Sequence, residues 1–432
     1  MHVNPSISRR AARSSFFSGV IGYGAVTAIL IASSIKNNTS DIANSEWWGA
    51  YQDASIIVFL KSQNTTILIL SALLLMFGAL RSAKMVPLFR HATLLLLTFY
   101  LYIIIRTLVP ASGLAMKFTL SFLVALGMAF NLYYTWASEN IEDSARRMFY
   151  AITIAAFWIV LVNFYNVLTG NGRVPGFNRL IGVGGHPNFT GVQLALGTPF
   201  LLMGALRRRS IWVLVFGGAL AINLYLLLMT GSRTAILTAS VAVIVAVSIR
   251  FKLSLSQFAV FSMSGLVLAA LFLYLLSLTD LMHVGSDSLF YRGENTRAGT
   301  FAYLLQSISE SPFSGLGRFE GLPENSLLRA WAAFGLGTPL FLLAIPLAAL
   351  FRFRKLVWAS KSLTYIAAIA GCFAGLIMGS LTEGYLVDAF SYPMLTFCVL
   401  TIFSDRAESV RLRVAAPSIE SSHINFGRSG NG

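Results

Sequence analysis

The chain has 432 residues, of which 56% are hydrophobic and 11% are charged, and its formal net charge is +15 at pH 7. Soluble globular domains carry about 25% charged residues, so this composition excludes an ordinary soluble protein and indicates a membrane protein. A large positive charge also suggests nucleic-acid binding, but the Lys and Arg residues recur between apolar segments and form no single basic patch. The sequence therefore predicts one membrane domain with the lipid bilayer, and no nucleic acid, as its partner.

Apolar segments that are long enough to cross a bilayer recur along the whole chain. A membrane-spanning helix needs about 20 mostly apolar residues. Twelve segments fit, at residues 14–35, 64–80, 88–105, 116–137, 148–169, 188–206, 211–229, 233–249, 258–279, 326–350, 363–382 and 386–404. We therefore predict an all-α, polytopic membrane protein with about 12 transmembrane helices. Residues 1–405 are expected to form a single integral membrane domain, and residues 406–432 a disordered tail.

The distribution of Lys and Arg predicts how these spans are oriented. When the N-terminal Arg9, Arg10 and Arg13 are placed in the cytoplasm and the loops alternate, 21 of the 32 Lys and Arg residues fall inside. This agrees with the positive-inside rule, so both termini are expected in the cytoplasm. The other 11 fall outside, namely Lys36, Lys61, Arg106, Lys117, Arg173, Arg179, Arg233, Arg292, Arg297, Arg318 and Arg329.

The longest predicted loop, residues 280–325, lies on the outer side between the ninth and tenth helices. It is rich in glycine and proline, and within it residues 300–309 (TFAYLLQSIS) are predicted to form a short amphipathic helix at the membrane interface. Loops of this length are usually functional. We expect this one to act as a lid over a site at the outer face.

Basic residues on the outer side work against the orientation rule and need another explanation. Arginine guanidinium groups hold phosphate oxygens bidentately, so a converging group suits a pyrophosphate. Alternatively, each arginine reaches to lipid headgroups or pairs with a carboxylate. Arg233 is the strongest candidate because it lies in residues 230–235 (TGSRTA), a polar break before an apolar stretch. The start of the next helix would add to its attraction for an anion, although a plain helical hairpin turn gives the same pattern.

Two further polar segments are candidates for chemistry. In residues 182–191 (GVGGHPNFTG), Asn188 can cap the following helix, and His186 either binds substrate or is structural. The second is the junction of the long loop with the tenth helix, where Glu324 and Asn325 follow the segment 311–318 (SPFSGLGR). A carboxylate there could accept a proton from a sugar hydroxyl, but both residues also suit a helix cap, which the spacing alone favours.

Taken in order, these segments resemble the O-antigen ligase and polymerase superfamily of membrane glycosyltransferases (Wzy and WaaL type), over about residues 170–400. In that family the junction usually reads His-Asn, with the histidine regarded as the base. This chain has Glu324 in that place, while Asn325 matches. The resemblance implies that Arg233 holds the donor pyrophosphate and that Arg297 or Arg292 is the arginine of the large loop. The predicted catalytic residues are thus Glu324 and Asn325, and the predicted substrate-binding residues are Arg233, Arg297, Arg292, Arg106, Arg318, His186 and Asn188.

The resemblance implies transfer from an undecaprenyl-pyrophosphate-linked oligosaccharide at the periplasmic face of a bacterial inner membrane, without a metal or another cofactor. The sequence contains no P-loop, dinucleotide fingerprint or metal-ligand cluster, and its two cysteines fall within predicted spans. Arginines would stabilise the leaving pyrophosphate in place of a metal. We therefore predict a metal-independent glycosyltransferase that works with a flippase and a chain-length regulator (polysaccharide co-polymerase).

The sequence is compatible with three functions. A polymerase of exopolysaccharide or O-antigen, for example of a xanthan-like polymer, is favoured because the missing junction histidine counts against a ligase that transfers chains to lipid A core. A flippase or exporter of lipid-linked oligosaccharides is the alternative from another class. It should line a central cavity with charges, whereas here Arg106, Arg233, Arg297 and Glu324 are predicted near one face.

Overall fold

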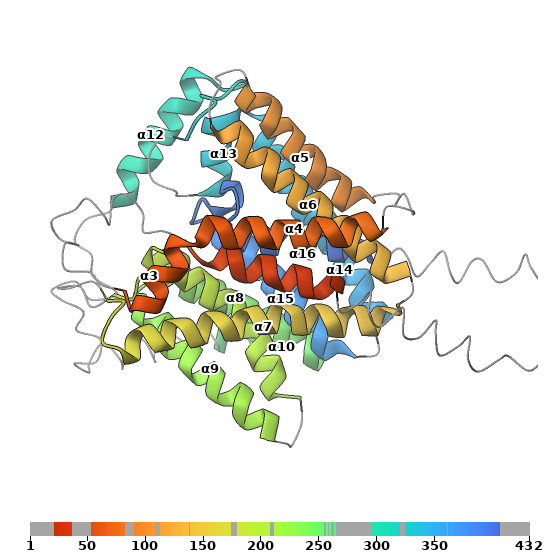
Figure 1. Cartoon of the computed structure of the whole chain (residues 1–432). Coiled ribbons are helices and arrows are strands. Elements are labelled where there is room, and N and C mark those ends of the chain that lie inside the picture. Colours follow the sequence, from red (N-terminus) through yellow and green to blue (C-terminus); the bar gives the residue numbers. More distant parts are fainter. Residues whose placement is uncertain are drawn as a thin grey trace, which may run out of the picture.

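The protein is described from a computed structural model. The described residues are 21–36, 53–82, 90–108, 113–137, 139–173, 179–207, 211–254, 256–257, 259–260, 263–264, 296–319, 325–360 and 362–406. Their helices are Ile21–Ser34, α3 (Ser55–Ser62), α4 (Asn64–Ser82), α5 (His91–Leu108), α6 (Leu114–Ala137), α7 (Ile141–Leu168), α8 (Pro187–Ala205), α9 (Ile211–Met229), α10 (Arg233–Phe251), α12 (Thr296–Glu310), α13 (Ser326–Phe334), α14 (Gly337–Ala359), α15 (Leu363–Ser380), the 3₁₀ turn η3 (Tyr385–Val387) and α16 (Tyr392–Ser404). Figure 1 shows this helical arrangement, and no β-strand occurs in these ranges.

The described helices confirm an all-α membrane protein at the level of composition and length. Six of them (α5, α6, α7, α9, α10 and α15) are long and apolar enough to cross a membrane, and the pair α3 and α4, bent by 59°, makes up to seven. The helices Ile21–Ser34 and α16 are apolar but shorter. The predicted span at 258–279 lies mostly outside the described residues.

Two predicted spans differ from the helices observed. The segment 326–350 is not one helix, because it breaks at Gly335 into α13 and α14. Gly335 has a φ of 83°, and a Cβ atom there would lie 2.1 Å from the carbonyl oxygen of Phe313. The last span begins at Tyr392 and not at residue 386, since Ser391 caps α16 and Pro393 occupies its first turn.

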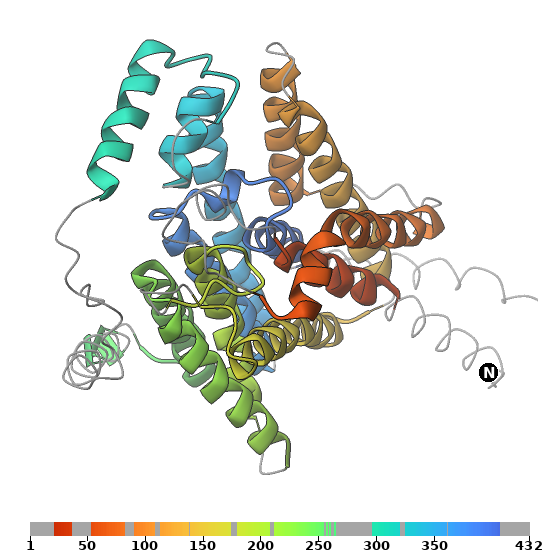
Figure 2. The same cartoon turned by 60° about the vertical axis from the view of Figure 1, so that its left-hand side comes forward.

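The helices form two groups, and α16 packs against both. One group contains α7, α8, α9, α10 and α15, and the other contains α4, α5, α6, α13 and α14. The helix α16 contacts α8 and α15 from the first group and α5, α6 and α14 from the second. Figure 2, which turns the left side of Figure 1 toward the viewer, shows α12 beside α13 of the second group.

The first group is centred on α8 and α15, which are apolar on all sides and almost fully buried. Glycines on α15 allow it to pack closely against α10. A Cβ atom at Gly371 would lie 2.4 Å from the Ala242 carbonyl oxygen, and one at Gly375 would lie 2.9 Å from the Ala242 Cβ. Small residues spaced four apart are a common packing face between membrane helices.

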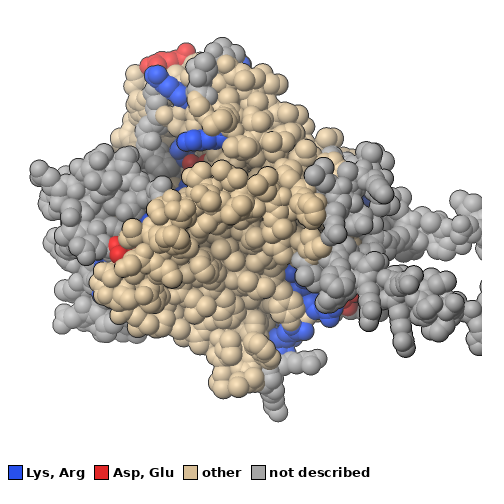
Figure 3. Space-filling model, in the orientation of Figure 1, with Lys and Arg blue, Asp and Glu red and all other residues tan. Residues whose placement is uncertain are grey.

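The outer surface of the bundle is strongly apolar. Large side chains on α9 are widely exposed, including Ile211 at 72% and Leu214 at 75%. In Figure 3 the face toward the viewer is a broad uncharged surface, and the visible charged side chains lie at its borders. An exposed apolar surface of this extent is expected for helices that face lipid.

A buried polar network at the end of α16 joins this helix to α5, α6 and α14. Asp405, directly after α16, pairs with Arg352 and accepts hydrogen bonds from the backbone N–H of Thr93 (2.9 Å) and the Tyr133 hydroxyl (3.1 Å). Arg406, the first residue of the predicted tail, is also buried and bonds to the Glu139 carbonyl. The rest of the predicted tail lies outside the described residues.

Candidate functional site

The first element of the candidate site is the glycine-rich turn before α8. Gly182 has a φ of 62°, and a Cβ atom there would lie 2.0 Å from the Asn163 side-chain oxygen, which accepts the Val183 N–H. His186 is the N-cap of α8, and its Nδ1 accepts the backbone N–H of Asn188 (3.2 Å). The prediction that Asn188 caps this helix is therefore wrong, because His186 is the cap. The Asn188 side chain makes other contacts.

The second element is the turn between α9 and α10. Gly231 adopts a φ of 59°, and a Cβ atom there would lie 3.0 Å from the Arg179 Nε. Ser232 caps α10 by accepting the Ala235 N–H (3.3 Å), so Arg233 becomes the first helical residue. The Arg233 side chain is exposed and forms no ion pair or hydrogen bond with any described residue. An exposed guanidinium at a helix start is well placed to bind an anion.

The third element is the junction at the start of α13. Asn325 has a φ of 43°, and its side-chain oxygen accepts the N–H groups of Leu327 and Leu328, both at 3.0 Å. Its amide group also donates to the Leu381 carbonyl (2.9 Å). The next residue, Ser326, donates its hydroxyl to the Glu383 carbonyl (2.7 Å). Asn325 is therefore a helix cap that attaches the junction to the segment between α15 and α16.

A chain of hydrogen bonds links these elements through Glu383. The Asn188 amide donates to the Glu383 carboxylate (3.1 Å), and the Asn188 side-chain oxygen accepts from Arg179 (3.2 Å). The same arginine donates through its Nε to the Thr230 carbonyl (2.8 Å), in the turn that carries Arg233. Glu383 is only 5% exposed. Four segments that are distant in sequence are thus linked at Glu383, through its side chain to Asn188 and through its backbone carbonyl to Ser326.

A second charged network lies beside the first. Arg329 on α13 pairs with Asp388 (2.9 Å) and also donates to the Gly384 carbonyl (3.0 Å). Asp388 in turn pairs with Lys36 at 3.5 Å. The Lys36 ammonium also lies 4.6 Å from the centre of the Phe189 ring, next to Asn188. These contacts fix the segment 381–391 against α8 and α13.

The ionisation of Tyr385 excludes this residue as a proton acceptor near neutral pH. Burial raises the pKa of Tyr385 well above its ordinary value, and the nearby Glu383 carboxylate acts in the same direction. The phenol therefore stays protonated, and it donates to the Leu376 carbonyl (2.7 Å). Within the described ranges, no group of three or more His, Cys, Asp and Glu residues is arranged to hold a metal ion.

Comparison with models of protein families gives no match for this chain, and comparison with curated proteins gives none either. The site is therefore interpreted from its own chemistry. The site region has a net positive charge, because its four basic residues outnumber its two acidic ones, Glu383 and Asp388. The basic residues are Lys36, Arg179, Arg233 and Arg329. A surplus of cations in this region suits an anionic substrate.

The remaining predicted site residues lie in α5 or in the predicted loop 280–325. Arg106, at the end of α5, donates through Nε to the Ser314 carbonyl (3.1 Å), so it holds the segment 311–318. Arg318 is exposed and, with Arg329, lines a small cavity under α12. Arg292 and Glu324 lie outside the described residues, and so does the side chain of Arg297.

The predicted amphipathic helix is present as α12 and has a packing role. Leu304 and Ile308 on this helix are buried against Ala332 of α13. The segment that follows α12 returns to α13, where Leu316 and Gly317 donate backbone N–H groups to the Ala332 and Ala333 carbonyls. This part of the large loop is therefore attached to the helix that begins at Asn325.

Sequence reasoning missed the two carboxylates of the candidate site, Glu383 and Asp388. Asp388 was assigned to a predicted span, 386–404, and Glu383 to the connection before it. A signal was present, since these are the only acidic residues between Glu324 and Asp405. Ionisable residues that interrupt a membrane segment are usually functional or paired.

Proposed function

We propose that the protein is a membrane glycosyltransferase that joins undecaprenyl-pyrophosphate-linked oligosaccharide units at the outer face of a bacterial inner membrane. The observation that carries this proposal is the meeting of the three predicted polar segments around Glu383. Asn188, Arg179 and Ser326 each make a hydrogen bond in that cluster. The same segments, in the same order, carry the resemblance to O-antigen polymerases and ligases.

In the proposed reaction, arginines bind the donor through its pyrophosphate. Arg233 is exposed and has no partner among the described residues, so its guanidinium is available for two phosphate oxygens. Arg179 is already oriented by Asn188 and Thr230 and adds positive charge to the same turn. When the bond between the sugar C1 and the pyrophosphate oxygen breaks, these cations stabilise the negative charge on the leaving group.

A carboxylate would complete the reaction by accepting the proton of the acceptor hydroxyl as its oxygen bonds to C1. We assign this step to Glu324, which occupies the place of the family histidine directly before Asn325. Glu383 is assigned a positioning role, because it contacts Asn188 and is buried. The polymerase is preferred over the ligase because this chain has no junction histidine.

The proposal is tested by replacing Arg233 in the full-length protein. A charge-assisted hydrogen bond contributes about 1.5–3 kcal/mol, so Arg233→Ala should raise the KM for the lipid-linked donor about tenfold to a hundredfold. Arg233→Lys should recover part of the loss because it keeps the charge. Polymer formation is measured with purified protein and donor, by gel separation of the products.

Arg354→Ala is the matched control, because Arg354 is an exposed arginine near the opposite end of the bundle. It should leave the KM unchanged. An unchanged KM in Arg233→Ala would remove the pyrophosphate-binding role. If the purified protein moves the donor across vesicles and forms no glycosidic bond, the flippase is correct instead.

A further inference from the structure

A cavity lies at the end of the bundle opposite the candidate site. It has a volume of about 690 Å³ and is bounded by the last turns of α10 and α14 and the start of α15. The opposite ends of two of these helices lie at the candidate site, because α10 starts at Arg233 and α15 leads to Glu383. The cavity is therefore a separate site, and its ligand does not depend on the proposed reaction.

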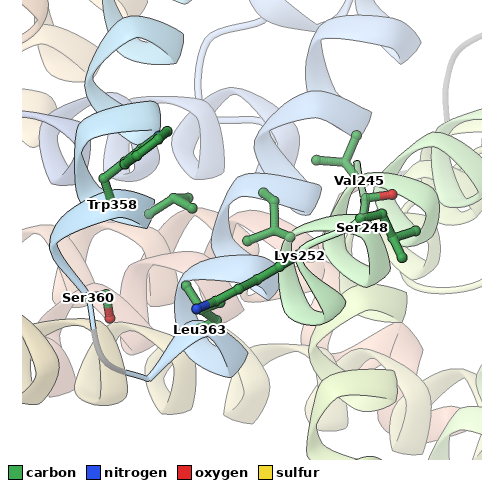
Figure 4. A pocket seen from close by; sticks show the side chains of 9 residues that line it. Val245, Ser248, Lys252, Trp358, Ser360 and Leu363 are labelled. Atoms are coloured by element: carbon green, nitrogen blue, oxygen red, sulfur yellow. The ribbon is translucent and has the colours of Figure 1, made fainter. Parts of the chain in front are cut away.

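The cavity is largely apolar, with one cationic side chain. Val357, Trp358 and Leu363 form apolar walls, and Lys252 supplies the charge. Figure 4 shows the Lys252 side chain running across the cavity from α10 toward Leu363. Lys252 forms no ion pair or hydrogen bond through its side chain with any residue that the structure describes.

The backbone at Lys252 gives a second, independent observation. Lys252 is the C-cap of α10, with a φ of 54° and a ψ of 43° in the left-handed region. Glycine is the residue usually found in this conformation, because a side chain is disfavoured there. A lysine in this position suggests that its side chain has a function.

The charge around the cavity favours an anion. No Asp or Glu occurs from Arg233 to Thr279 or from Asn325 to Thr382, so α10, α14 and α15 carry no carboxylate that could pair with Lys252 or repel an anion. A further cation, Arg250, lies in the last turn of α10. The complementary ligand is negatively charged at one end.

The polar groups of the cavity also limit the ligand. The Ser248 hydroxyl already donates to the Ile244 carbonyl (2.7 Å), and the Ser360 hydroxyl donates to the Ser362 carbonyl (3.2 Å). Lys252 is thus the main available donor, which suits one phosphate and does not suit a sugar with many hydroxyl groups. Trp358, exposed to 80%, has the position of an aromatic residue at a membrane boundary.

We propose that this cavity binds an anionic glycerophospholipid, with the headgroup phosphate on Lys252 and the upper acyl chains against Val357, Trp358 and Leu363. The lysine lies at the end of a predicted membrane span, where a lipid phosphate is within reach. The apolar walls provide the contact that the acyl chains need. The lipid bridges α10 and α14 across α15, which contacts both helices.

The test uses the full-length purified protein and native mass spectrometry. The amount of phosphatidylglycerol that stays bound to the protein is compared with the amount of bound phosphatidylcholine that has the same acyl chains. The attraction between one basic residue and an anionic lipid surface predicts roughly fivefold weaker retention of phosphatidylglycerol in Lys252→Gly. Glycine fits the left-handed conformation, so this variant should fold normally. Lys252→Arg should retain the lipid.

The matched control is Lys355→Gln, which removes an exposed lysine that does not line the cavity. It should retain phosphatidylglycerol like the unchanged protein. Equal retention in Lys252→Gly would overturn the proposal, and so would equal binding of phosphatidylcholine and phosphatidylglycerol by the unchanged protein. A dimer that is lost in Lys252→Gly without any change in bound lipid would assign the cavity to a second copy of the chain instead.

Discussion

Glu383 holds the Asn188 amide, and through it Arg179, in one orientation. Replacement by alanine removes an acceptor that is charged and buried, at a cost of about 1.5–3 kcal/mol. We expect Glu383→Ala to raise the KM for the lipid-linked donor about tenfold or more, because Arg179 loses its fixed position. Glu383→Gln keeps an acceptor for Asn188 and should have a smaller effect. Steady-state kinetics of polymer formation separate KM from kcat.

The control for this substitution is Glu310→Gln, since Glu310 is exposed at the end of α12 and accepts a hydrogen bond from Gln306 (3.0 Å). It should leave both constants unchanged. A fall in kcat with an unchanged KM in Glu383→Gln would instead make Glu383 a proton acceptor and contradict its positioning role.

Glu324 is expected to behave differently from Glu383. If Glu324 accepts the acceptor proton, Glu324→Gln should abolish polymer formation while the amount of protein in the membrane stays normal, because glutamine cannot take up a proton at neutral pH. Polymer is measured by gel, and protein by immunoblot of membranes. Unchanged polymer length and yield would show that Glu324 only caps the helix, as Asn325 does.

Single residues could be predicted from the sequence where a short local motif identifies them. Asn188 lies three residues after Gly185, and Arg233 lies two residues after Gly231; the positive φ of both glycines can be anticipated from a turn. Glu383 could not be placed in the same way, because its contact with Asn188 joins residues 195 positions apart. The helix cap was predicted at Asn188, but the N-cap of α8 is His186, directly before Pro187.

Among the elements, the packing of α15 on α10 connects the two charged parts of the candidate site, since α10 begins at Arg233 and α15 ends three residues before Glu383. A Cβ atom at Gly375 would lie 2.9 Å from both the Ala242 Cβ and the Thr238 carbonyl oxygen. Gly375→Leu should therefore separate the helices and destabilise the protein by at least about 1–3 kcal/mol, measured as a lower melting temperature in detergent.

Gly218→Leu is the control for this substitution, because no atom lies within 4 Å of a Cβ atom at that position of α9. It should leave the melting temperature unchanged. An equal decrease in both variants would show that any leucine in a membrane helix is destabilising here, and that the α10 contact has no special role.

Hydrophobic segments predicted most of the described helices because a span must be apolar along its whole length. The break between α13 and α14 could not be predicted in this way. The segment 326–350 is mostly apolar and has one charged residue, Arg329. The break depends on Gly335 packing against the Phe313 carbonyl. A tertiary contact of this kind leaves no trace in hydropathy, although the glycine itself permits the turn.

For the whole molecule, the two ends of the bundle carry separate polar networks. One end contains the candidate site around Glu383 and Asp388, and the other contains Asp405 with Arg352. Between them, the face in Figure 3 has a broad uncharged surface with charged side chains at its borders. This division agrees with a molecule that crosses a bilayer, and the positive-inside rule then predicts which end faces out.

The predicted orientation can be tested with single introduced cysteines. The two native cysteines, Cys372 and Cys398, are buried, so they should react slowly with a maleimide. Ser309 on α12 and Ala359 at the end of α14 are exposed, at the site end and the cavity end respectively. If the candidate site faces out, Ser309→Cys should react with a membrane-impermeant maleimide in intact spheroplasts, whereas Ala359→Cys should react only after permeabilisation. The reverse pattern would place the candidate site in the cytoplasm, where a lipid-linked donor that has already crossed the membrane could not reach it.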